Sequence, residues 1–136
     1  MQKLALALIA ALVIAGCVGQ TTQQEITTTE ESIKPTGVTK EFTISGITDV
    51  SDGTYRFNKD KIIVNAGDAV KIIFTTTDVS TGHNLNIDEF DAHIATVNGG
   101  ATNVAEFYAD KKGEFNYYCN IGDHRAKGME GTLVVE

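Results

Sequence analysis

The chain has very few side chains that carry sulfur or an aromatic nitrogen. Its 136 residues include no tryptophan, two cysteines, two methionines and three histidines. Two cysteines form at most one disulfide, so a disulfide-rich scaffold is excluded. The net charge of −7 disfavours nucleic acid and anionic membrane surfaces as partners. Because the sulfur and imidazole groups are so few, the positions at which they occur are informative.

Three of these scarce residues lie in one C-terminal segment. Cys119, His124 and Met129 are separated by four residues each, and they follow a β-like run at residues 115–118. A second imidazole, His83, lies far upstream in a Gly-His-Asn tripeptide. Two imidazoles, a thiolate and a weak axial thioether are the ligands of a blue-copper electron-transfer site. The pattern therefore predicts one type 1 copper ion bound by these four residues.

Two alternatives for Cys119 remain open on sequence grounds. One is a buried thiol beside unrelated surface histidines, and the other is a structural disulfide with Cys17. The N-terminal pattern described below argues against the disulfide. His93 is expected to be a solvated strand or loop residue, and it is left out of the site because the four-ligand set is already complete.

The segment around these ligands resembles the cupredoxins, the small type 1 copper proteins that include plastocyanin, azurin and auracyanin. The resemblance extends from Val38 to Glu136, and it is strongest in residues 113–119 and 128–135, which flank the ligand loop. One departure is Gly122-Asp123 before His124, where several relatives carry Pro-Gly. The resemblance implies a copper-binding β domain and leaves the docking surface open.

The resemblance also implies roles for residues around the ligands. The asparagine after the upstream histidine ties the two ligand loops together in the family, so Asn84 and Asn120 are candidates for that contact. The Gly82 carbonyl is a candidate for approach to copper opposite Met129, as a backbone oxygen does in azurin. Tyr118 is a candidate for a lateral electron path, as in plastocyanin-like proteins.

The hydrophobic pattern predicts an all-β domain over residues 38–136. Short runs rich in Val, Ile, Phe, Tyr and Thr alternate with turn residues, and no sustained helical period or internal repeat occurs. The predicted strands are 40–44, 61–64, 70–75, 104–108, 114–119 and 132–135. Strands of this length and spacing predict a Greek-key sandwich or barrel.

The period of two places the side chains of the strand before the ligand loop. Phe115, Tyr117 and Cys119 are predicted to share the core face, with Tyr118 on the other face. Tyr117, two residues before the cysteine, matches the position of a tyrosine corner, whose hydroxyl bonds to nearby backbone. His124 is expected to be the ligand nearest solvent, within a small apolar rim of residues 121, 122, 126 and 128.

The first 17 residues have the pattern of a signal peptide with a lipobox. Lys3 precedes an apolar run over residues 4–15, which is shorter than the roughly 20 residues of a spanning helix, and Cys17 follows as the expected lipidation site. The alternative is an uncleaved N-terminal anchor. Residues 18–37, rich in Thr, Gln and Glu, are predicted to be a disordered tether. Both alternatives place the domain outside the cytoplasmic membrane.

The function predicted from these features is one-electron transfer by a monomeric carrier anchored to the membrane. The expected partners are redox proteins, such as a basic cytochrome or a membrane oxidoreductase. Copper storage, buffering or delivery uses the same ligands and remains the alternative. A copper enzyme is not expected, because the His-X-His pairs and second domain of multicopper oxidases are missing from this sequence.

Overall fold

A computed structural model describes residues 32–136 of the chain. Within this range nine β-strands and one short 3-10 helix form the secondary structure. No helix in this range is long and apolar enough to cross a membrane. The strands are β1 (Thr39–Asp49), β2 (Thr54–Phe57), β3 (Lys61–Val64), β4 (Ala69–Thr76), β5 (His83–Ile87), β6 (Ala92–Val97), β7 (Thr102–Tyr108), β8 (Gly113–Tyr118) and β9 (Glu130–Val135), and the helix is η1 (Asp88–Phe90).

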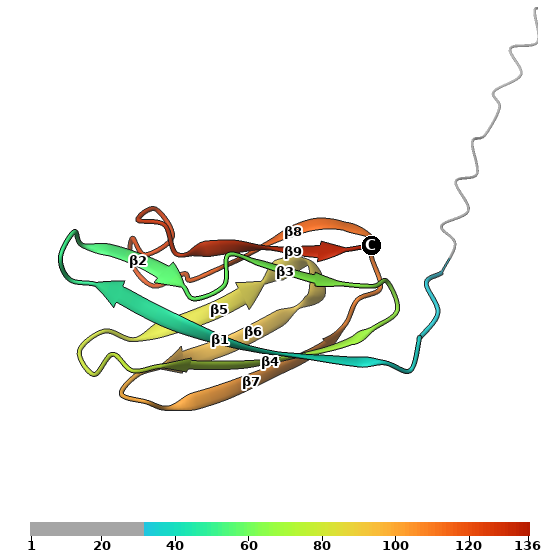
Figure 1. Cartoon of the computed structure of the whole chain (residues 1–136), viewed down its shortest axis with the longest axis horizontal. Coiled ribbons are helices and arrows are strands. Elements are labelled where there is room, and N and C mark those ends of the chain that lie inside the picture. Colours follow the sequence, from blue (N-terminus) through green and yellow to red (C-terminus); the bar gives the residue numbers. More distant parts are fainter. Residues whose placement is uncertain (1–31) are drawn as a thin grey trace, which may run out of the picture. The chain divides into compact units, whose positions relative to one another are not determined.

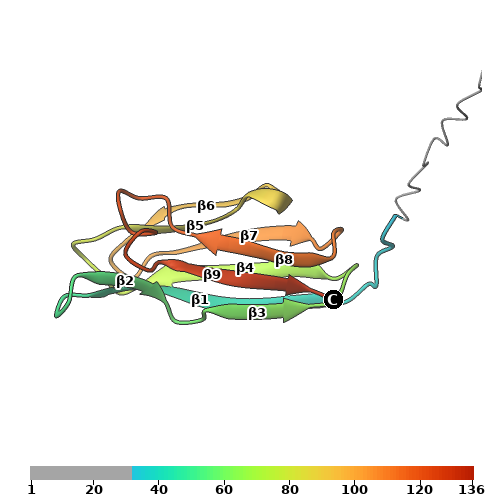
Figure 2. The same ribbon diagram turned by 90° about the horizontal axis from the view of Figure 1, so that it is seen from above.

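The strands form two sheets. One sheet has the order β2-β1-β4-β7, and the other has the order β3-β9-β8-β5-β6. Within the sheets β1 pairs in parallel with β4 and β3 pairs in parallel with β9, whereas the other pairs are antiparallel. Figures 1 and 2 show the two layers from perpendicular directions. This arrangement confirms the predicted all-β sandwich.

The core lies between the sheets and follows from the alternation of the strands. Every second residue of β4 is buried, as are the alternate residues of β9, because successive side chains point to opposite faces of a sheet. Ile44, Ile72, Phe74 and Leu133 are completely buried. Burying a side chain of this size stabilises the fold by about 1.5–3 kcal/mol before the entropy cost of ordering it.

All six predicted strands occur, five of them with bounds that differ by at most two residues, whereas β1 extends to Asp49, five residues beyond its predicted end. Three further strands, β2, β5 and β6, were not predicted. In β5 all five residues are buried, including a histidine and two asparagines, so the strand has neither alternation nor an apolar run. The β5 register also shifts between His83 and Leu85, which identifies an irregularity at Asn84.

Tyr117 links β8 to the segment before β3. Its hydroxyl donates to the backbone oxygen of Lys59 at 2.6 Å, and burial raises its pKa far above the usual value. The ring crosses Gly131, its partner in β9, where an added Cβ would overlap the ring atoms. The predicted backbone bond of a tyrosine corner is therefore present, but its acceptor is 58 residues upstream instead of close in sequence.

The β1–β2 turn, the β4–β5 loop and the β8–β9 loop gather at one end of the sandwich, and the C-terminus lies at the other end (Figure 1). The segment before β1 joins the domain at that second end. Thr36 is bonded there to the Gly67 oxygen through its backbone N–H at 2.8 Å and to the Asp68 carboxylate through its hydroxyl at 2.7 Å. Ordered contacts thus begin before residue 38, while residues 1–31 lie outside the described part.

Candidate metal centre

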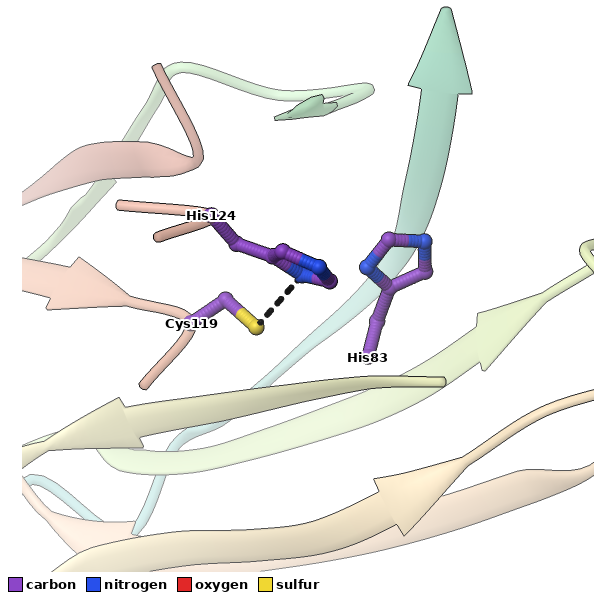
Figure 3. Close-up of side chains that lie close together, drawn as sticks. All are labelled: His83, Cys119 and His124. Atoms are coloured by element: carbon purple, nitrogen blue, oxygen red, sulfur yellow. Dashed lines mark hydrogen bonds between the residues drawn. The ribbon is translucent and has the colours of Figure 1, made fainter. Parts of the chain in front are cut away.

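Three buried side chains meet at the end of the sandwich that carries the β8–β9 loop. His83 begins β5, Cys119 follows β8, and His124 lies in the β8–β9 loop. One donor atom from each lies within 4.8 Å of the others, and Cys119 Sγ is 3.5 Å from His124 Nδ1. Figure 3 shows the three side chains pointing toward one another. Strands distant in sequence therefore bring together the residues predicted to bind metal.

The His83 imidazole is fixed by three residues from two neighbouring segments, β1 and the β4–β5 loop. Its Nε2 lies 2.9 Å from Asp78 Oδ2 and 3.1 Å from Thr48 Oγ1. Gly46 packs so closely that an added Cβ would lie 2.9 Å from each of three His83 carbons. The ring is completely buried, so it has little freedom to turn.

The other ring nitrogen of His83, Nδ1, is buried without a hydrogen-bond partner. Leaving a buried polar atom unpaired costs about 1–3 kcal/mol. A metal ion between Nδ1, the Cys119 sulfur and His124 would satisfy it, and imidazole nitrogen and thiolate are donors that suit copper. The residues present therefore fit a copper ion.

Asp78 sets the orientation of His83. Its Oδ2 accepts the backbone N–H of Thr48 at 2.9 Å in addition to its contact with His83. Burial alone would raise the pKa of Asp78, but the hydrogen bonds from Thr48 and His83 outweigh burial and hold that pKa below its usual value. An ionised carboxylate at Nε2 favours the tautomer with the proton on Nε2, which leaves the Nδ1 lone pair free for a metal.

Backbone hydrogen bonds close the loop between β8 and β9. The Cys119 N–H donates to the Met129 oxygen at 3.1 Å, and the Met129 N–H donates to the His124 oxygen at 3.0 Å. Lys127 N–H donates to the oxygens of Asp123 and His124 at 3.0 and 3.2 Å, which forms a helix-like turn. Met129 is completely buried at the end of this loop. The three loop residues predicted as ligands thus have fixed backbone positions relative to one another.

His124 is covered on one face by Tyr55 of β2. The two rings are stacked with centroids 3.8 Å apart and an interplanar angle of 17°, and His124 is only 5% exposed. Burial is the main cause that holds the pKa of His124 below its usual value, which favours the neutral imidazole that can donate a lone pair. His124 is the least buried of the four predicted ligands, as expected. The ring of Tyr55, which was not part of the predicted apolar rim, covers one of its faces.

Asn84 and Asn120 join the two ligand segments. Asn84 Nδ2 donates to Asn120 Oδ1 at 2.6 Å, and the Asn120 backbone N–H donates to Asn84 Oδ1 at 3.0 Å. Asn86 Nδ2 donates to the same Asn84 oxygen at 3.2 Å and to the Tyr118 backbone oxygen at 3.3 Å. The amides therefore satisfy one another, which explains how a strand as polar as β5 is buried.

Tyr118 lies on the face of β8 opposite Tyr117. Its hydroxyl donates to Asp88 Oδ2 at 2.9 Å, and Arg125 lies over its ring at 4.1 Å from the centroid. The hydrogen bond to Asp88 raises the pKa of Tyr118. The tyrosine is thus held in place between η1 and the ligand loop.

Three other residues considered from the sequence are not members of the His-Cys-His cluster. His93 is half exposed, and its ring contacts Asn86 and Asp91. Asp123 forms an ion pair with Lys127 at 3.0 Å, and this interaction lowers the pKa of Asp123. Gly82 packs closely on Thr96, and an approach of its carbonyl to copper stays a prediction. Cys17 lies outside the described residues.

A family model described as a cupredoxin-like domain matches residues 4–135. The chain belongs to the cupredoxin family. For this cupredoxin, the family and the His-Cys-His cluster with Met129 together assign a single type 1 copper site, and they place the protein among copper electron carriers in general. A search of curated proteins found no match.

Solved structures similar to this cupredoxin include both small copper proteins and larger copper enzymes. Auracyanin A, a blue copper protein from Chloroflexus aurantiacus, is 20% identical with a TM-score of 0.61, and the match covers 72% of this chain and 99% of that chain. Reduced auracyanin from Roseiflexus castenholzii is 17% identical with a TM-score of 0.59, and the match covers 74% and 99%. A copper-containing nitrite reductase from Thermus scotoductus is 27% identical with a TM-score of 0.60, and the match covers 73% of this chain but only 28% of the reductase.

The structure adds four residues that sequence reasoning did not select: Gly46, Thr48, Tyr55 and Asp78. They lie in β1, in β2 and after β4, and each contacts at least one of the two histidines of the cluster. Their residue types are common, and none lies in the ligand loop. Of the four, only Asp78 could have been selected from the sequence, because it is a polar residue five positions before a predicted ligand.

Proposed function

We propose that this cupredoxin is a one-electron carrier in which His83, Cys119, His124 and Met129 bind a single copper ion. The observation that carries the proposal is the buried cluster with an unpaired His83 Nδ1 facing a cysteine and a second histidine. Copper bound there supplies a one-electron couple between Cu(I) and Cu(II).

The contacts of the cluster support electron transfer over copper delivery. His83 is fixed by Asp78, Thr48 and Gly46, and the ligand loop is closed by its own backbone hydrogen bonds. A site whose donor atoms are held in place needs little rearrangement when the oxidation state changes, which favours fast electron transfer. Delivery of copper needs ligands that can open, and the packing around His83 opposes such opening.

The distribution of histidines supports a carrier over an enzyme. Oxidases and reductases that use copper need a further ligand cluster for the substrate. His93, the third histidine of the sequence, is already in contact with Asn86 and Asp91 on the surface. The similarity to nitrite reductase concerns 28% of that protein and supports the shared fold.

We further propose that lipidated Cys17 anchors the domain outside the cytoplasmic membrane as a monomer. The support is the lipobox-like pattern of residues 1–17. The described segment before β1 also joins the domain at the end opposite the metal cluster (Figure 1). A tether at that end leaves the end of the sandwich with the metal cluster accessible to redox proteins, and the net charge of −7 favours basic ones such as a cationic cytochrome.

Spectroscopy of the copper-loaded domain tests the ligand assignment. We expect strong thiolate-to-copper charge transfer in the visible spectrum and one copper ion per chain. His83→Gln should abolish this band, whereas the matched variant His93→Gln should keep it, because His93 lies outside the cluster. A colourless copper complex, or equal effects of the two substitutions, would contradict the proposal.

Two further measurements separate the carrier from its alternatives. Reversible voltammetry with fast electron self-exchange supports a carrier, whereas rapid transfer of copper to a chelator without a reversible couple supports a storage or delivery protein.

For the anchor, the full chain and its Cys17→Ala variant are expressed and fractionated. The wild type is expected in the membrane fraction and the variant in the soluble fraction, and equal fractionation would contradict lipidation at Cys17.

A further inference from the structure

The β1–β2 hairpin reaches both histidines of the metal cluster. Thr48 in β1 and Tyr55 in β2 are cross-strand partners. The hydroxyl of Thr48 lies 3.1 Å from His83 Nε2, and the ring of Tyr55 stacks on His124. Tyr55 also makes an edge contact with His83, with ring centroids 6.0 Å apart. One cross-strand pair therefore covers the cluster on the side of β2.

Tyr55 is held against the ligand loop by more than ring stacking. Its backbone N–H donates to the Lys127 oxygen at 3.3 Å, and Lys127 Nζ lies 5.6 Å from the centroid of its ring. Gly128 approaches so closely that an added Cβ would lie 3.3 Å from the Tyr55 backbone oxygen. Gly128 also has a φ of 104°, a conformation that other residues rarely adopt. The hairpin and the ligand loop thus fit together over several contacts.

The ring of Tyr55 stands between His124 and the surroundings of the protein. Tyr55 is itself partly exposed, whereas His124 is 5% exposed. Stacked aromatic rings exclude water from the covered face and add about 0.5–1.5 kcal/mol to the packing. A molecule that approaches His124 from this side meets Tyr55 first.

From these contacts we propose that Tyr55 shields His124, so that a partner protein or a competing metal ligand contacts the tyrosine ring instead of the ligand imidazole. The proposal rests on the proposed function in one respect, namely that His124 is a copper ligand. It deepens that function because a shielded imidazole hinders replacement of His124 by an incoming ligand. Copper then stays bound while redox partners dock against Tyr55.

Acylation of histidines in the metal-free domain tests the shielding without any copper. Diethyl pyrocarbonate is the probe, and mass spectrometry of the peptides gives the rate at each histidine. His93, which is exposed, is the internal reference, and the burial of His124 predicts a several-fold lower rate at that residue. Equal rates at His93 and His124 in the wild type would overturn the proposal.

Substitutions of Tyr55 assign the protection to its ring. Tyr55→Phe keeps the stacked ring and should leave the slow rate at His124 unchanged, whereas Tyr55→Ala should raise that rate toward the rate at His93. If the alanine variant does not fold, Tyr55→Leu, which retains apolar bulk on β2, takes its place. Whichever of the two folds is the open-face variant, in which no aromatic ring covers His124. An unchanged His124 rate in a folded variant without the ring would overturn the proposal.

Copper extraction gives the second arm of the experiment. The loaded wild type and Tyr55→Phe are expected to lose Cu(I) to bicinchoninate at similar slow rates, and the open-face variant several-fold faster. If acylation shows shielding but neither the wild type nor any variant has a thiolate-to-copper band, the shielding stands and the proposed function fails. If the band is present and neither rate responds to loss of the ring, the proposed function stands and the shielding fails.

Discussion

Replacing Asp78 by asparagine removes a negative charge beside His83 but keeps an oxygen that can accept hydrogen bonds. In the structure Asp78 Oδ2 lies 2.9 Å from the Thr48 nitrogen and 2.9 Å from His83 Nε2. The His83 ring thus separates the Asp78 carboxylate from the unpaired Nδ1. A negative charge at this position stabilises Cu(II) more than Cu(I), so its removal should raise the reduction potential.

The size of the effect follows from the separation. One unit charge at roughly 7 Å with an effective dielectric constant of about 20 contributes about 2 kcal/mol. That energy corresponds to about 100 mV for one electron. The carboxylate is 24% exposed, so solvent screening reduces the effect, and we expect a rise of roughly 50–100 mV.

Voltammetry of three proteins isolates this effect. Asp52→Asn is the matched control, because Asp52 lies in the β1–β2 turn and accepts hydrogen bonds from Thr54 without contacting the cluster. Both variants change the net charge equally. Equal potentials of Asp78→Asn and Asp52→Asn would refute the role of Asp78.

Asp78→Ala removes the hydrogen-bond acceptor as well as the charge. Because His83 then loses its orientation, we expect about 10–100-fold weaker copper binding.

Substitutions at four further positions test other parts of the domain. Cys119→Ser should abolish the visible charge-transfer band while the circular dichroism stays that of a β protein, and a retained band would exclude Cys119 as the thiolate ligand. Met129→Leu should raise the reduction potential and Met129→Gln should lower it, since a stronger axial donor stabilises Cu(II); voltammetry without this order would remove Met129 from the site. Gly46→Ala places a methyl group 2.9 Å from His83 carbons and should cost about 1–3 kcal/mol in urea unfolding of the metal-free domain, whereas unchanged stability would mean that His83 can shift freely. Tyr117→Phe loses the buried backbone hydrogen bond and should cost about 1 kcal/mol in the same assay, and an equal midpoint would show that this bond adds no stability.

The sequence predicted those parts of the structure in which a local pattern determines the outcome. Alternation in the strand before the ligand loop gave the buried face of Tyr117 and Cys119, and the four-residue spacings gave the loop itself. The strands β3, β4 and β9 were predicted to within two residues of their ends, because each is a run rich in Val, Ile, Phe or Thr that turn residues interrupt.

What could not be predicted depends on contacts between distant segments. The contact between Asn84 and Asn120 was expected from the family resemblance, but the burial of strand β5 also depends on Asn86, which donates to Asn84 Oδ1 and to the Tyr118 oxygen and which no local pattern indicates. The positions of Asp78 and Tyr55 near the histidines depend on how the β4–β5 loop and the β1–β2 hairpin fold over the cluster. Such side chains look ordinary in the sequence, and only the tertiary structure gives them their neighbours.

The parallel pairing of β3 with β9 has a consequence for the order of events during folding. Lys61 pairs with Thr132, so this ladder joins residues 71 positions apart in the chain (132 − 61). Contacts of such sequence separation form slowly, because a long loop must close before they are gained. Met129 lies directly before β9, and its backbone holds Cys119 and His124 in the closed loop. We therefore expect the closed ligand loop to form only after β9 has docked, so that copper capture follows folding instead of initiating it.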